Sequence, residues 1–214
     1  MTRVRIDLNI SLDGFAAGAD TTDHPMGADW DRLTAAYVGT RTFRERVLGD
    51  TSGTGTTGMD DAYAVAYFEG VGAEIMGAGM FGLHSFPDDP EWKGWWGDQP
   101  PFRCPVYTLT HTAPRPAISF ENGTTFHFRN APIEDVLAEA TEAAGGADVR
   151  VGGGVGAARA YLLAGLVDQL HVAIAPVVLG RGNPLWADLR GLDLTHKATT
   201  EVAESGTIHV TFAR

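Results

Sequence analysis

Apolar and polar residues alternate at the start of the chain. Between Val4 and Ile10 every second residue is apolar, and this period of two predicts a strand that ends at Ser11. From Asp31 to Leu48 apolar residues return at helical spacing, which predicts one continuous helix. Asp29 or Asp31 is placed to cap it. The chain is therefore expected to begin with a strand followed by a helix.

Strand and helix patterns continue to alternate through the middle of the chain. Strands are predicted over 73–76, 106–109, 124–128, 149–151 and 170–178, and helices over 60–68, 133–144 and after residue 154. Residues 192–203 and 207–212 are typical of a closing antiparallel hairpin. This order predicts an α/β fold with a mixed, mainly parallel sheet. We expect a single domain over 1–214, with a mobile loop over about 49–59, where Gly, Ser, Thr and Asp dominate.

Glycines or polar residues follow three of the predicted strands. The stretch VRVGGGVGAARAYLLAGLVDQL, residues 149–170, is ordered as strand, glycine turn and helix. A second glycine turn follows the strand AEIM, and Thr110-His111-Thr112 ends a third strand. Glycines before a helix allow an anion to approach its N-terminal N–H groups, so these turns are candidate phosphate sites. Tight packing between strand and helix is the alternative explanation of each turn taken alone.

Composition narrows the class of partner. Of the 214 residues, 44% are hydrophobic and 20% charged, as in an ordinary globular protein. The net charge is −11 and the 16 Lys and Arg residues are scattered. Nucleic acids and anionic membranes are recognised by clustered basic residues, so this pattern excludes both and favours a small-molecule substrate.

Cysteine content and hydropathy indicate the compartment. Cys104 is the only cysteine, which excludes an intramolecular disulfide and suits a reducing cytoplasm. No Cys/His spacing predicts a metal site, and no apolar stretch approaches the length of a membrane span. We therefore expect a cytoplasmic protein without a bound metal.

Five motifs along the chain resemble one known family. They are SLDGFAAG after the first strand, the IMG of AEIMGAGMF, VYTLTH, VRVGGG and AGLVDQLHVAIAPVVLGRG. In this order they resemble the dihydrofolate-reductase-like proteins, which include the reductase domain of riboflavin biosynthesis. The resemblance extends over most of the chain. It implies a three-layer fold around a central mixed, mainly parallel sheet, with a C-terminal antiparallel hairpin.

The resemblance also implies an NADPH site at the carboxyl edge of the sheet. Many relatives carry an arginine where this chain has Ala78, so NADH is an alternative cofactor unless Arg115 or His111 binds the 2′-phosphate. The residues implied at the site are Gly153, Gly154, Val155 and Gly156 at the pyrophosphate, Gly77, Ala78, Gly79 and Met80 at the neighbouring helix start, Thr110 and His111 near the adenosine ribose, and Ala16 and Ala17 facing the nicotinamide.

The predicted function is an NADPH-dependent oxidoreductase. It would transfer hydride to a small heterocycle, pterin-like or pyrimidine-like, or to a carbonyl compound. Asp13 and Asp29 are the candidate catalytic residues, for proton transfer or substrate orientation, although Asp13 in its Asp-Gly pair also suits a plain turn. The alternative is a non-catalytic nucleotide-binding module that keeps the fold. The sequence is compatible with a homodimer and with a monomer.

Overall fold

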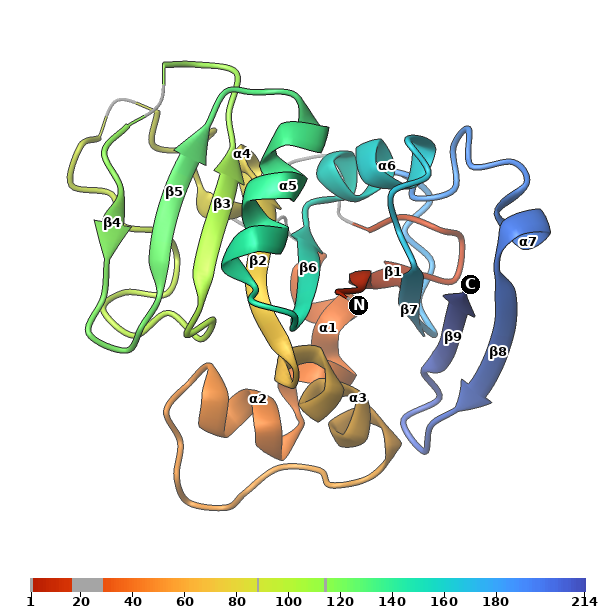
Figure 1. Cartoon of the computed structure of the whole chain (residues 1–214). Helices are drawn as coiled ribbons and strands as arrows, with labels where there is room; N and C mark the ends of the chain where they lie inside the picture. Colours follow the sequence, from red (N-terminus) through yellow and green to blue (C-terminus); the bar gives the residue numbers. More distant parts are fainter. Residues whose placement is uncertain (1, 17–28, 88, 114) are drawn as a thin grey trace. The chain divides into compact units, whose positions relative to one another are not determined.

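The computed structural model describes residues 2–16, 29–87, 89–113 and 115–214 (Figure 1). Contacts divide the chain into two compact units. The first unit comprises Met1–Ile6 and Gly70–Asp168, and the second comprises Asp7–Glu69 and Gln169–Arg214. Strand β1 (Val4–Ser11) contributes its first residues to one unit and its remaining residues to the other. The single domain expected from the sequence stays a prediction.

The first unit is built on mostly parallel strands. Along its sheet the order is β4-β5-β3-β2-β6, followed by the start of β1. Each neighbouring pair is parallel except β4 and β5, which are antiparallel. The bounds are β2 (Val71–Gly77), β3 (Pro105–Leu109), β4 (Ile118–Ser119), β5 (Thr125–Arg129) and β6 (Asp148–Gly153).

Three helices belong to the first unit: α4 (Ala78–Phe81), α5 (Ile133–Ala143) and α6 (Val155–Leu163). Helix α5 buries Val136 and Ala140, which lie four positions apart on one helical face. Phe81 of α4 is fully buried, and its ring meets the rings of Phe126 and Phe128 edge-on with centroids 5.0 Å away. The short helix α4 is therefore held by an aromatic core.

A tryptophan-rich segment, residues 84–102, packs onto the end of α4. Trp92 Nε1 donates a hydrogen bond to the carbonyl of Phe81 at 2.9 Å, and its ring stacks on Phe86 with centroids 4.0 Å apart. Trp96 packs against the core and meets Phe102 edge-on. These tryptophans anchor their segment to the first unit.

The second unit contains the rest of β1 and the end of the chain. Its strands are β7 (Gln169–Ala175), β8 (Lys197–Val202) and β9 (Ile208–Ala213), in the order β1-β7-β9-β8. β9 is antiparallel to both neighbours, so the predicted C-terminal hairpin is confirmed. Its helices are α1 (Trp30–Val38), α2 (Arg41–Arg46), α3 (Met59–Phe68) and the short, unpredicted α7 (Leu192–Thr195).

The single helix expected between Asp31 and Leu48 is wrong, because the chain forms α1 and α2 instead. Thr40 is extended, with φ −70° and ψ 152°, and its hydroxyl accepts a hydrogen bond from the N–H of Phe43 at 3.1 Å. This hydroxyl caps a new helix. Asp29 does stand at the N-cap of α1, but its side chain makes no capping hydrogen bond.

Residues 49–58 make several polar contacts. The Arg44 guanidinium forms an ion pair with Asp50 at 2.5 Å, and the backbone of Thr56 exchanges hydrogen bonds with Gly39 and Arg41. These contacts hold the loop near α2, and its mobility stays a prediction.

Candidate functional site

Three strand ends lie side by side in the first unit. In the sheet register Met76 of β2 is opposite Gly153 of β6, and Gly77 is opposite Leu109 of β3. A Cβ atom on Gly77 would lie 3.7 Å from the backbone nitrogen of Gly154. The two glycine turns are therefore adjacent, as expected for the carboxyl ends of neighbouring parallel strands.

The N-terminus of α6 is open at two glycines. Gly154 is the N-cap residue, and as a glycine it has no side chain that could cap the helix. A Cβ on Gly154 or on Gly156 would meet no heavy atom of the described residues within 4 Å. The first N–H groups of a helix have no intrahelical partner and lie at the positive end of its dipole. This turn thus offers backbone donors and space to an anionic group such as a phosphate.

The neighbouring turn is more crowded. Ala78 and Gly79 begin α4, and a Cβ on Gly79 would lie 2.9 Å from His84 Nδ1. Met80 is partly buried against the aromatic core. His84 therefore lies over the turn, and no sequence motif singled it out.

The third strand end is polar, as predicted, but its groups bond to one another. The Thr110 hydroxyl lies 2.9 Å from that of Thr112, and the Thr110 N–H donates to the carbonyl of Arg129. His111 is exposed. Arg115 donates to the carbonyl of Asp89 at 2.7 Å, while its Nη1 is buried without a hydrogen-bond partner among the described residues. Arg115 thus keeps a donor that a phosphate oxygen could use.

Asp13 is used by the backbone of the second unit. Its two carboxylate oxygens accept hydrogen bonds from the N–H groups of Leu179 at 3.1 Å and Gly180 at 2.6 Å. The Ser11 hydroxyl, more than these two N–H groups, lowers the pKa of Asp13 to about 2. A carboxylate that is stabilised in this way anchors a loop, and the catalytic role of Asp13 stays a prediction.

Two other predicted site residues also lie in the second unit. The N–H of Ala16 donates to the carbonyl of Asn183 at 3.0 Å, and Asp29 forms an exposed ion pair with Arg32 at 2.8 Å. Ala17 lies outside the described residues. The roles of Ala16, Ala17 and Asp29 stay predictions.

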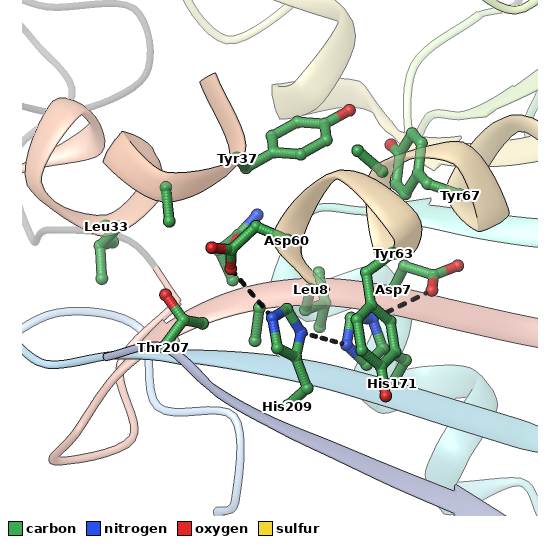
Figure 2. A pocket seen from close by; sticks show the side chains of 14 residues that line it. Asp7, Leu8, Leu33, Tyr37, Asp60, Tyr63, Tyr67, His171, Thr207 and His209 are labelled. Carbon is green, nitrogen blue, oxygen red and sulfur yellow. Dashed lines mark hydrogen bonds and ion pairs between the residues drawn. The ribbon is translucent and has the colours of Figure 1, made fainter. Parts of the chain in front are cut away.

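The second unit also holds a pocket that the sequence analysis missed (Figure 2). Asp60 and Tyr63 of α3, Asp7 of β1, His171 of β7 and His209 of β9 all line it. Its cavity measures about 40 Å³, which is room for roughly two or three water molecules. Each histidine has an apolar residue on either side of it in its strand. This was the only signal in the sequence that could have pointed to buried histidines.

The pocket side chains form a continuous polar chain. His171 Nε2 lies 3.0 Å from His209 Nδ1, and His209 Nε2 lies 3.0 Å from Asp60 Oδ1. At the other end, His171 Nδ1 is 3.3 Å from Asp7 Oδ1. Figure 2 shows these three contacts in sequence beside Tyr63. Four titratable groups are therefore linked below α3.

Comparison with protein families decides the assignment. The sequence model of the RibD C-terminal domain matches residues 2–208. The chain belongs to the RibD C-terminal domain family. This family is the reductase domain of riboflavin biosynthesis, so the chain is assigned to the reductase class of enzymes. No curated protein matches the sequence.

Solved structures show the same fold. A protein from Shewanella sp. PV-4 assigned to riboflavin biosynthesis has a TM-score of 0.62 at 21% identity, over 100% of this chain and 99% of that one. Acinetobacter baumannii RibD has a TM-score of 0.55 at 15% identity, and the match covers 100% of this chain and 58% of RibD. The RibD C-terminal domain family member described here thus has the predicted dihydrofolate-reductase-like, mixed α/β fold.

A third similar structure comes from Thermotoga maritima. It is a diaminohydroxyphosphoribosylaminopyrimidine deaminase/5-amino-6-(5-phosphoribosylamino)uracil reductase, with a TM-score of 0.55 at 14% identity, over 99% of this chain and 56% of that one.

Among the helices that the structure describes, none is long and apolar enough to cross a membrane.

Proposed function

We propose that this protein is an NADPH-dependent reductase of a small heterocyclic substrate of the pyrimidine or pterin kind. The open N-terminus of α6 beside the Gly77 turn is the observation that supports the proposal. Membership of the RibD C-terminal domain family and the name of the Thermotoga maritima relative support the reaction class and a pyrimidine as substrate.

The residues present fit a dinucleotide at the first unit. Gly154 and Gly156 leave empty the positions that side chains would fill, and the first N–H groups of α6 would hold the pyrophosphate. Gly77, Ala78, Gly79 and Met80 would form the other side of this cradle. Thr110 and His111 would lie towards the adenosine ribose, and Arg115 Nη1 would bind the 2′-phosphate in place of the arginine absent at position 78.

When bound, the nicotinamide supplies the hydride, and the protein supplies position and a proton. Ala16 and Ala17 are proposed, as from the sequence, to face the nicotinamide, because small side chains permit close approach. The first unit binds and orients the cofactor through backbone donors.

The homodimer stays a prediction, and light scattering of the purified protein would measure its mass.

Calorimetric titration with NADPH and NADH tests the proposal. Gly154→Ala adds one methyl group where the fold leaves space, with a φ of −68° that alanine adopts readily, so the protein should fold while its affinity falls at least tenfold. Leu163→Ala at the exposed end of the same helix is the matched control and should bind normally. Normal NADPH binding by Gly154→Ala would refute the cradle. Arg115→Ala should weaken NADPH binding more than NADH binding.

Turnover is measured separately, as NADPH oxidation with a panel of pyrimidine and pterin acceptors. Oxidation with one of them is the expected result. Saturable binding without oxidation by any acceptor would overturn the reductase proposal and leave a nucleotide-binding protein.

A further inference from the structure

The two buried histidines of the pocket require a specific number of protons. His171 Nε2 and His209 Nδ1 lie 3.0 Å apart, so one proton must lie between them. A second proton lies between His209 Nε2 and Asp60, which are also 3.0 Å apart. A bare ring nitrogen 3.3 Å from a carboxylate would be repelled, so a third proton lies between His171 Nδ1 and Asp7.

Three protons leave one positive charge on the pair of rings. Two neutral imidazoles carry only two N–H protons, so with both carboxylates ionised one ring is an imidazolium. The four side chains together then carry a net charge of −1. The side chains are almost fully enclosed, with exposed fractions of 8% for His171, 3% for His209, 12% for Asp7 and 11% for Asp60.

Tyr63 independently favours this charge. Its ring stacks on His171, with centroids 4.3 Å apart and an angle of 8°, and on His209 at 4.0 Å and 3°. The face of an aromatic ring attracts a cation. The Tyr63 hydroxyl donates to Glu201 Oε2 at 2.6 Å, which places another carboxylate near the pair. The two imidazoles thus lie beside the aromatic face of Tyr63 and among carboxylates from α3, β1 and β8.

The charge rests mainly on His171. Burial lowers the pKa of His209, the hydrogen bond to Asp60 opposes this, and the neighbouring His171 lowers it further. His209 is therefore the neutral ring, which donates to Asp60 and accepts from His171. The imidazolium lies against Asp7, whose Oδ2 is buried without a hydrogen-bond partner among the described residues. An atom of this kind is available to a proton donor or acceptor in the pocket.

We propose that His171 and His209, held between Asp7 and Asp60, form a proton store that supplies the pocket through Asp7. Its use in turnover rests on the proposed reductase function, because reduction by hydride also consumes a proton. In the step itself, one proton passes through the Asp7 carboxyl group to a water molecule in the pocket, and the store falls from three protons to two. Its net charge changes from −1 to −2, and water then returns one proton.

Nitrogen-15 NMR of the histidine rings counts these protons directly. His171→Gln and His209→Gln assign the signals among the 7 histidines of the chain. At pH 7 three of the four nitrogens of the pair should carry hydrogen. Two protonated nitrogens at pH 7 would overturn the proposal.

Variants identify the role of the carboxylates. Asp7→Asn removes the charge that faces His171, so the number of protonated ring nitrogens should fall to two. Asp60→Asn should lower this number in the same way, because it removes the charge that faces His209. Tyr63→Phe keeps the aromatic ring and is the control, with three protonated nitrogens. A count of three in Asp7→Asn would refute the role of Asp7, and circular dichroism checks that each variant is folded.

Kinetics separate the store from the reductase proposal. With an acceptor that is turned over, Asp7→Asn should lower kcat more than tenfold, with the KM for NADPH unchanged. An unchanged kcat would show that the store does not serve the reaction. If no acceptor is reduced, the reductase proposal fails while the proton count still decides whether the store exists.

Discussion

Glu74 and Arg150 are opposite residues of neighbouring parallel strands and form an ion pair of 2.5 Å in which each side chain is only 1% exposed. Beyond this pair the register continues through Ile75 and Val151, and a bulge at Gly152 then places Met76 opposite Gly153. The pair therefore lies just before the two glycine turns. It favours the register that brings these turns together, because a slip by one residue would separate two buried charges.

Glu74→Gln should destabilise the protein by about 3 kcal/mol, because it leaves the Arg150 charge buried without its anion. Denaturant unfolding measures the change. Arg32→Gln removes an ion pair whose arginine is 53% exposed, and it should cost less than about 1 kcal/mol. Equal losses of unfolding free energy in Glu74→Gln and Arg32→Gln would show that the buried ion pair contributes no more to stability than the exposed one.

Gly152→Ala should also be destabilising, by roughly 1–3 kcal/mol, because its Cβ would overlap Glu74 Oε1. Gly156→Ala, where the structure leaves space among the described residues, should keep or raise the melting temperature. Thermal unfolding of both variants gives the comparison. An unchanged melting temperature in Gly152→Ala would show that Glu74 does not occupy this bulge.

Thr40→Ala should lower the free energy of unfolding by about 1 kcal/mol, since it removes the hydroxyl that caps α2. Thr40→Ser keeps that hydroxyl and should restore most of the loss. A Thr40→Ser variant as unstable as Thr40→Ala would attribute the effect to packing of the methyl group.

Asp13 should titrate at about pH 2, below the ordinary range of an aspartate, chiefly because the Ser11 hydroxyl stabilises its ionised form. Its contribution to stability is therefore full above the unfolded pKa and is lost as the pH falls through about 2. Carboxyl NMR measures the midpoint, and Ser11→Ala should raise it. A midpoint near pH 4 in the unchanged protein would contradict the Asp13 contacts.

The strands and glycine turns could be predicted because their signals are local. The alternation from Val4 to Ile10 gave the bounds of β1, and the glycines after Val151 marked the turn between β6 and α6. The division between α1 and α2 was missed because it depends on the extended backbone of Thr40 and its capping bond. Apolar residues at helical spacing continue across such an interruption, so the pattern does not reveal it.

The histidine pocket could not be predicted because its partners are distant in the sequence. Asp60 and His209 are separated by 149 positions, and His171 and His209 by 38. Each residue alone is typical of an ordinary helix start or a strand. Only the pairing of β7 with β9 and the position of α3 bring them together.

The tryptophan anchor of α4 also gives the protein an optical signal that distinguishes its two units. Of the 5 tryptophans, Trp92, Trp95 and Trp96 belong to the first unit, while Trp30 and Trp186 belong to the second. A protein with both Trp30→Phe and Trp186→Phe would emit only from the segment that is bonded to the carbonyl of Phe81. Its emission would report unfolding of the first unit by itself, so the order in which the two units lose structure becomes measurable.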